Sequence, residues 1–226
     1  MKKNKKILII GDSNCLPRYN ASTPNVIKLE ETYIYKLKTI FKDYHFEQIT
    51  LGGILTSELI NHAIPYFVSW KPDILLMHTG INDTKSQVKR NIFLKIIEKI
   101  FLFLSFSKKD FKSKVLYNRS ILKHYSESKT NLSSFEKNID KLKILFSESK
   151  ILWLEIFSDE RIDNERPNTS KNIDKFNSVL KRNFKENFIE IGEIKNKKFF
   201  TLDGYHLNKL GHDKLCEKLS KFIETH

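Results

Sequence analysis

Short apolar segments alternate with segments of helical period along most of the chain, and this alternation restricts the fold more than any other feature. The apolar segments are rich in β-branched and aromatic residues and span residues 6–10, 46–51, 73–79, 150–157 and 188–191. Several are apolar at consecutive positions, which is typical of parallel strands buried on both faces. The pattern therefore predicts an α/β fold, a three-layer doubly wound sandwich with a mostly parallel five-stranded sheet.

Helical periodicity is clearest in three segments. Their apolar side chains recur at spacings of three and four residues: Tyr33, Leu37 and Ile40; Phe135, Ile139, Leu142 and Phe146; and Leu215, Leu219, Phe222 and Ile223. Ser133 precedes Glu136 by three residues, the spacing of a capping box, so we expect Ser133 to cap the second of these helices.

The length of 226 residues suits one domain. The interval from about 84 to 132 is long for a single crossover, and its apolar-basic stretch, residues 91–106, is followed by a Lys-rich polar run. We expect a single domain over residues 1–226 with a helical insertion at about 84–132 that lies over the strand ends. An enlarged scaffold helix with a surface loop explains the interval equally well.

The formal net charge is +13, but the lysines are spread along the whole chain. A solvated, Lys-rich surface explains this best, and an anionic or lipid-linked ligand or a membrane surface is the next explanation. No helix-turn-helix, zinc-ligand or ribonucleoprotein signature is present, so we expect no nucleic-acid partner. A basic nucleic-acid-binding module without catalysis remains an alternative.

No segment has the pattern of a membrane span or a secretion signal. The basic start is followed by only four apolar residues, 7–10, and the apolar stretch near residue 100 is interrupted by Lys95, Glu98 and Lys99. The two cysteines make neither a disulfide framework nor a zinc pattern. We expect a cytoplasmic protein, in peripheral contact with a membrane at most.

Glycines and polar side chains follow the expected strands. Ser13 follows the first strand, Gly52 and Gly53 follow the second, residues 80–83 (Gly-Ile-Asn-Asp) follow the third, and residues 203–206 (Asp-Gly-Tyr-His) precede the last helix. Ligands of an open parallel sheet bind at the carboxyl ends of its strands. Segments far apart in sequence are therefore expected to meet at one edge.

These residue types together suit acyl transfer through a nucleophilic serine. The Ser13 hydroxyl needs a base, which His206 provides, and an imidazole needs an orienting carboxylate, which Asp203 provides. The backbone N–H of Ser13, a glycine N–H at residue 53 and the amide of Asn82 are three candidate donors to an oxyanion.

Each of these residues also has a structural explanation when taken singly. Serine and aspartate cap helices, and glycine, asparagine and aspartate form turns. A lone histidine is often only a surface side chain. The ordered set of four elements at strand ends favours the catalytic interpretation.

The set resembles the SGNH hydrolase family, also called GDSL-type esterases. Residues 11–13 (Gly-Asp-Ser) match the family's first block, residues 80–83 match its third, and Asp203 and His206 match its last. The resemblance runs from residue 7 to residue 223 apart from the insertion. The second block departs from the family, because Thr50 and Leu51 stand where Asn is usual and two glycines follow. We choose Gly53 as the donor there, with Gly52 as the alternative. Asn14 replaces the usual Leu after the serine.

The resemblance implies cleavage of esters of small acyl groups, lipids or acetylated sugars without metal or cofactor. We therefore expect a serine hydrolase of small acyl esters, above all acetyl esters, on a glycan or lipid-linked sugar. Ser13, His206 and Asp203 would form the triad, and Asp12, Gly52 and Asp83 would support it. An O-acetyltransferase on the same triad is the alternative, because some relatives transfer acetyl groups on cell-envelope polysaccharides.

Three other chemistries have weaker support. Cys15 lies two residues after Ser13, but packing is its expected role. Asp203, His206 and His212 match no standard spacing of metal ligands. The first turn lacks the glycine pattern of a dinucleotide site.

Overall fold

The computed structural model describes residues 5–19, 26–89, 92–103, 107 and 118–225. Its centre is a five-stranded sheet in the order β2-β1-β3-β6-β7, in which every neighbouring pair is parallel. The strands are β1 (Lys6–Gly11), β2 (His45–Thr50), β3 (Ile74–His78), β6 (Lys150–Leu154) and β7 (Phe188–Ile189). The predicted fold class is confirmed, although the last two strands are shorter than expected.

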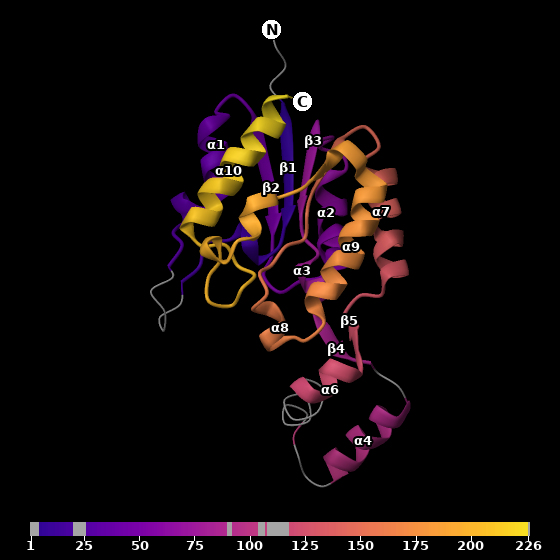
Figure 1. Ribbon diagram of the computed structural model, residues 1–226. Helices are drawn as coiled ribbons and strands as arrows, with labels where there is room; N and C mark the ends of the chain where they lie inside the picture. Colours follow the sequence, from indigo (N-terminus) through magenta and orange to yellow (C-terminus); the bar gives the residue numbers. More distant parts are fainter. Residues whose placement is uncertain (1–4, 20–25, 90–91, 104–106, 108–117, 226) are drawn as a thin grey trace.

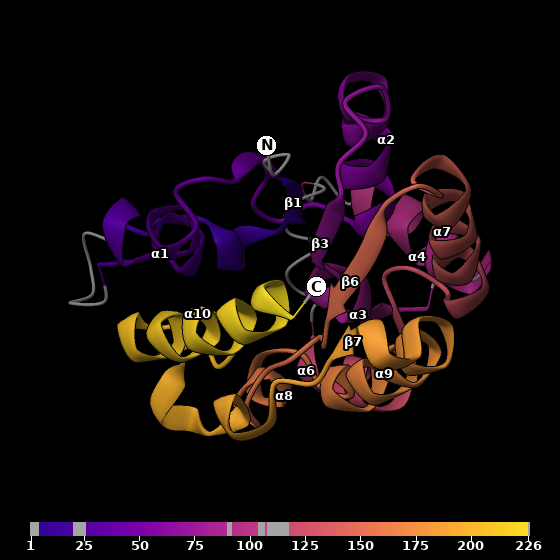
Figure 2. The same cartoon turned by 90° about the horizontal axis from the view of Figure 1, so that it is seen from above.

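Helices cover both faces of the sheet, as Figures 1 and 2 show. Alternate β1 residues pack into different cores, with Ile7 and Ile9 facing one side and Leu8 and Ile10 the other. This explains the uninterrupted apolar run, because both faces of the strand are buried. The helices on the first side are α1 (Tyr33–Ile40) and α10 (Lys209–Glu224), and those on the second are α2 (Thr56–Phe67), α7 (Leu132–Leu145) and α9 (Thr169–Phe184).

Further elements lie outside these layers or connect them. The helical ones are η1 (Ser13–Cys15), η2 (Leu29–Glu31), α3 (Ile81–Thr84), α4 (Ile92–Phe103), α6 (Arg119–His124), α8 (Ile162–Glu165), η4 (Lys185–Asn187), η5 (Gly192–Lys195) and η6 (Lys197–Phe199). The short strands β4 (Ser86–Val88) and β5 (Ser126–Ser128) form a separate antiparallel pair.

The start of α7 differs from the prediction. Asn131 is its N-cap, and the side chain of Asn131 accepts a 2.7 Å hydrogen bond from the Ser134 N–H. The capping box predicted from Ser133 is therefore wrong, because an asparagine two residues earlier already satisfies the first turn. The apolar face of the helix is confirmed, since Phe135, Ile139 and Leu142 are fully buried.

Two helices that follow β4 and precede β5 in sequence, α4 and α6, lie beyond the end of the sheet at which β1 and β3 finish (Figure 1). In α4, Ile96, Ile100 and Phe103 are 50%, 53% and 87% exposed. The three lysines at 108, 109 and 112, part of the basic run, lie outside the described residues. Among the helices of the described chain, none is long and apolar enough to cross a membrane.

Candidate active site

Ser13 begins the short helix η1 directly after the central strand β1. Asp12 is the N-cap of η1, and its Oδ1 accepts a 3.0 Å hydrogen bond from the Asn14 N–H. The Asp12 N–H donates to the His78 carbonyl of the neighbouring strand at 3.0 Å. A Cβ at Gly11 would overlap Cys15 Sγ, so only glycine permits this tight turn. The Gly-Asp pair thus ends the strand abruptly and sets Ser13 at its carboxyl end.

Two short hydrogen bonds join Ser13, His206 and Asp203. Ser13 Oγ lies 2.7 Å from His206 Nε2, and His206 Nδ1 lies 2.7 Å from Asp203 Oδ2. A carboxylate only accepts, so Nδ1 donates to Asp203 and Nε2 is left to accept from the hydroxyl. His206 is buried, with 5% exposure. The geometry is that of a nucleophile, a base and an orienting group in sequence.

The carboxylate of Asp203 is held by several donors besides the imidazole. Its Oδ1 accepts from Thr201 Oγ1 at 2.8 Å and from the Tyr205 and His206 backbone N–H groups at 3.2 and 3.0 Å. Arg18 Nη1 lies 3.6 Å from Oδ2, the atom that also faces the imidazole. Asp203 therefore both caps its own turn and fixes the ring of His206.

Asn14 is a site residue whose function the sequence analysis missed. Its Nδ2 donates to the Tyr205 carbonyl at 3.0 Å, and its Oδ1 accepts from the Leu207 N–H at 3.1 Å. These two residues flank His206. The side chain after Ser13 therefore holds the loop that carries His206 in place. The one signal in the sequence was the departure from Leu, which suggested a packing change rather than hydrogen bonds.

The two glycines after β2 have different environments. A Cβ at Gly52 would lie 3.8 Å from Ser13 Cβ, whereas a Cβ at Gly53 would meet nothing within 4 Å. Gly53 has φ +74°, in the left-handed region that glycine adopts without strain. Gly52 thus borders the serine and Gly53 turns the chain. The choice of Gly53 as an oxyanion donor stays a prediction.

Asn82, from the segment after β3, contacts the segment that follows β2. It lies in α3, is 4% exposed, and its Nδ2 donates to the Ile54 carbonyl at 3.2 Å. An amide carries two N–H groups, and this bond uses one of them. The bond ties the segment after β3 to the segment after β2, where an oxyanion site is expected.

Asp83 is buried and joins three segments. Its Oδ2 accepts from the Thr56 N–H at 2.9 Å and from Thr56 Oγ1 at 2.7 Å, and its Oδ1 accepts from Thr130 Oγ1 at 2.6 Å. The side chain thus anchors the start of α2 and the strand-end loop before α7 to the loop of Asn82. Its predicted role in supporting the site stays a prediction.

Several solved structures share this architecture. A lipase/acylhydrolase from Enterococcus faecalis is 16% identical and superposes with a TM-score of 0.64, covering 98% of this chain and 96% of that one. A GDSL-like lipase from Bacteroides thetaiotaomicron is 15% identical and superposes with a TM-score of 0.62, covering 100% of this chain and 90% of that one. An acetyl xylan esterase is 18% identical and superposes with a TM-score of 0.60, covering 96% of this chain and 99% of that one. This chain has the SGNH hydrolase fold. No family model matches the sequence, and no curated protein matches it.

In this SGNH hydrolase fold, burial is the main cause of the shifted pKa values near Ser13. Burial raises the pKa of Asp12 to about 7, against the hydrogen bond from the Asn14 backbone and the attraction of Lys85. Burial also lowers the pKa of Lys85 to about 8, and repulsion by Lys129 adds to that effect. Both groups therefore change charge close to neutral pH.

Close to Ser13 in sequence, Cys15 belongs to a buried polar cluster of this SGNH hydrolase fold. Tyr33 Oη lies 3.0 Å from Cys15 Sγ and 2.9 Å from His78 Nδ1, and the Tyr33 N–H donates to His212 Nδ1 at 3.3 Å. Burial raises the pKa of the Cys15 thiol well above its usual value, so a thiolate nucleophile is disfavoured. His212 faces Tyr33, and the described residues contain no group of three or more side chains placed to hold a metal ion.

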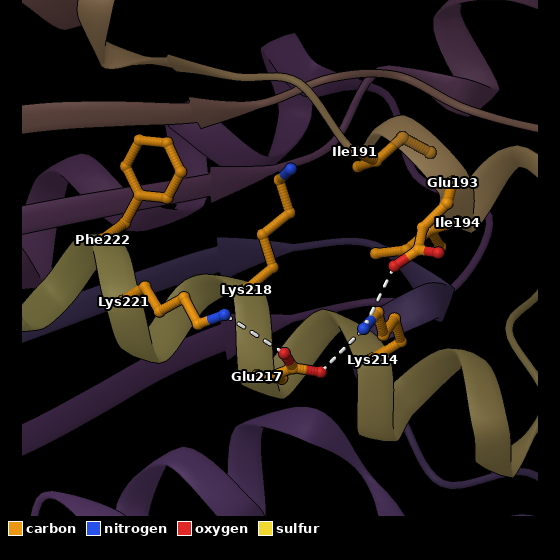
Figure 3. A pocket seen from close by; sticks show the side chains of 8 residues that line it. All are labelled: Ile191, Glu193, Ile194, Lys214, Glu217, Lys218, Lys221 and Phe222. Carbon is orange, nitrogen blue, oxygen red and sulfur yellow. Dashed lines mark hydrogen bonds and ion pairs between the residues drawn. The ribbon is translucent and has the colours of Figure 1, made fainter.

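Two hollows on the surface of the SGNH hydrolase fold have no lining residue in common with the predicted site. One of about 250 Å³ lies between α10 and residues 191–194, where Lys214 and Lys221 converge on Glu217 (Figure 3). Another of about 730 Å³ lies between α1 and α10. Their lining residues include no member of the predicted site, so they do not bear on its chemistry.

Proposed function

We propose that this chain is a serine-dependent carboxylic ester hydrolase of the SGNH family. The observation that carries the proposal is the hydrogen-bonded series from Ser13 Oγ through His206 to Asp203. Its members lie 193 residues apart in sequence, yet they meet at the carboxyl edge of the sheet. The fold shared with lipases and esterases supports the same reaction class.

In the proposed reaction, His206 Nε2 takes the hydroxyl proton as Ser13 Oγ attacks the carbonyl carbon of the ester. The carbonyl oxygen becomes an oxyanion and accepts hydrogen bonds from the Ser13 N–H, a glycine N–H after β2 and the Asn82 amide. The imidazolium returns the proton to the leaving alcohol, and an acyl-serine remains. Water then attacks the acyl group with His206 as base, which releases the acid and restores the serine.

The acyl group is proposed to be small, above all acetyl, on a glycan or lipid-linked sugar. Support comes from the fold shared with an acetyl xylan esterase. A sugar hydroxyl in place of water would make the chain an O-acetyltransferase through the same acyl-serine. Product analysis with and without an acceptor sugar separates the two, because transfer consumes the acceptor and hydrolysis releases acetate regardless of it.

We also propose that the chain forms one domain in which about 84–132 is an insertion that selects substrate. The antiparallel pair of β4 with β5 closes the base of this segment, with Ser86 opposite Ser128. Its helices α4 and α6 lie beyond the carboxyl edge where the site is expected. Removal of the exposed apolar stripe at Ile96, Ile100 and Phe103 should change selectivity between esters rather than the rate on a minimal aryl acetate.

The decisive experiment compares wild type with Ser13→Ala on 4-nitrophenyl acetate. Loss of the nucleophile should lower kcat by about 10³-fold or more. Ser147→Ala is the matched control, because Ser147 is exposed and lies at the opposite end of the fold. A fluorophosphonate should label wild type at Ser13, as read by peptide mass spectrometry. Wild-type turnover by Ser13→Ala would refute the proposal.

A further inference from the structure

Lys85 lies one aromatic ring away from the base of the proposed triad. Its Nζ is 3.8 Å from the centroid of the Tyr205 ring, and that ring is 4.1 Å, centroid to centroid, from the imidazole of His206. His206 Nε2 in turn lies 2.7 Å from Ser13 Oγ. The order ammonium, phenol ring, imidazole and hydroxyl therefore runs across the carboxyl edge of the sheet.

The ammonium of Lys85 lacks a carboxylate partner among the residues that the structure describes. Among the described residues, no carboxylate oxygen lies within ion-pair distance of its Nζ, whereas Lys195 and Lys209 pair with glutamates at 2.6 and 2.9 Å. Lys85 is half-buried, and burial lowers its pKa to about 8. A cation held out of water without a counter-ion is unfavourable, and a tyrosine face compensates for that only in part. A bound anion would complete the site.

Charged groups of both signs act on the same tyrosine. Burial raises the pKa of Tyr205 to about 12, the negative charges of Asp203 and Glu165 add to that rise, and Arg18 and Arg166 act in the opposite direction. Lys129 and Arg166 also repel the charge of Lys85, and Glu165 and Asp12 attract it. Asp12 is itself only partly ionised near neutral pH because burial raises its pKa to about 7. Charges of both signs therefore act here, and the case for an anion rests on the Lys85 ammonium, which lies over the Tyr205 ring and pairs with no carboxylate among the described residues.

We propose that Lys85 is an anion subsite that binds a carboxylate or phosphate on the alcohol part of the ester substrate. This inference rests on the proposed function. The imidazole must return its proton to the leaving oxygen, so the alcohol part leaves along the His206 ring. The Tyr205 ring lies next to the His206 ring, and the Lys85 ammonium lies over the Tyr205 ring. Lys85 would thus select esters of anionic sugars, sugar phosphates or other acidic alcohols.

Three acetates test the charge directly: 4-acetoxybenzoate, 4-acetoxyphenyl phosphate and the neutral methyl 4-acetoxybenzoate. The readout is the kcat/KM of each anionic ester divided by that of the neutral ester. Lys85→Met should lower this ratio about 10-fold, the effect of losing one charge-assisted contact. Lys85→Arg should keep most of it. Whichever anionic ester loses more identifies carboxylate or phosphate as the preferred group.

Lys42→Met is the matched control, because Lys42 is exposed in the turn before β2 at the opposite edge of the sheet. It should leave the ratio unchanged. If Lys85→Met lowers kcat/KM equally for all three esters, Lys85 only supports Tyr205 and the subsite is refuted.

A binding measurement separates this inference from the proposed function. Calorimetry would compare 4-hydroxybenzoate with its neutral methyl ester on wild type and Lys85→Met. If no ester is cleaved in a Ser13-dependent way, the proposed function fails. The anion subsite is still supported if Lys85→Met binds 4-hydroxybenzoate about 10-fold more weakly than wild type does while its binding of the neutral methyl ester is unchanged. Equal binding to both proteins refutes the subsite whether or not the esters are cleaved.

Discussion

The side-chain amide of Asn14 donates a 3.0 Å hydrogen bond to the backbone carbonyl of Tyr205. The same amide accepts from the Leu207 N–H at 3.1 Å, so it bonds to both neighbours of His206. Asn14 also follows Ser13 directly, and its own N–H is held by Asp12. One buried side chain therefore couples the position of Ser13 to that of His206.

Asn14→Leu, which restores the residue usual in the SGNH family, should lower kcat on 4-nitrophenyl acetate by about 10- to 100-fold. Both hydrogen bonds are lost, so His206 is held less firmly against Ser13. KM should change less than kcat, and the rate of fluorophosphonate labelling should fall in parallel at a temperature where both proteins are folded. Asn14→Asp keeps the acceptor but loses the donor, and its effect should be intermediate. Asn14→Leu with wild-type kcat and labelling would leave Asn14 as a packing residue.

Asn82→Ala should lower kcat by about 10²- to 10³-fold, the usual cost of one oxyanion donor. Its KM should change little, because the donor acts on charge that develops during the reaction. The variant also loses the 3.2 Å bond to Ile54, so melting temperature must be measured beside activity. Asn61→Ala, at an exposed position in α2, is the control. A loss confined to melting temperature would make Asn82 a structural tie.

Asp203→Asn should lower kcat by about 10²- to 10⁴-fold with a small effect on stability. An asparagine can keep accepting from the Tyr205 and His206 N–H groups through one oxygen, which preserves the turn. Its NH₂ would then face His206 Nδ1 and favour the wrong tautomer. Full activity with an unchanged melting temperature would show that Asp203 is only a cap.

Asp12→Asn tests the buried carboxyl beside the nucleophile through the pH dependence of stability. The folded-state pKa of Asp12 is raised from 3.8 to about 7, so the folded chain keeps the proton where the unfolded chain loses it. The stability that this group contributes is therefore fully present below about pH 4 and is lost as pH rises through 7. An asparagine does not ionise, so the free energy of unfolding of the variant relative to wild type should increase between pH 4 and pH 8, by about 4 kcal/mol.

Two buried histidines have the opposite effect on the pH dependence of stability, but wild type and Asp12→Asn both contain them. Burial lowers the pKa of His78 to about 3 and of His212 to about 4, so their contribution is present above about pH 6.5 and is lost as pH falls through those values. Their effect cancels when the variant and wild type are compared by urea unfolding at each pH. A constant difference across the range would mean that Asp12 does not titrate near neutral pH.

The local pattern of the sequence was sufficient for the sheet and for the candidate residues. Runs such as residues 7–10 are apolar at every position, which specifies a strand buried on both faces without knowledge of its neighbours. Ser13, Asn82, Asp203 and His206 were identified because each lies in a short block next to a strand or helix end. Strand ends were less certain: the run expected to extend to residue 157 leaves the sheet after Leu154.

The tertiary structure decided what depended on contacts between distant segments. The bonds from Asn14 to Tyr205 and Leu207 cross 191 and 193 residues of sequence, and nothing near Asn14 predicts them. A Cβ at Gly52 would contact Ser13 and one at Gly53 would meet nothing within 4 Å, although the two glycines are adjacent in sequence and Gly53 has a left-handed backbone. The ammonium of Lys85 lies over the ring of Tyr205, a residue far away in the sequence, because the packing of the elements brings the two together. Local pattern determines which elements form, whereas the packing of those elements determines which side chains meet at their ends.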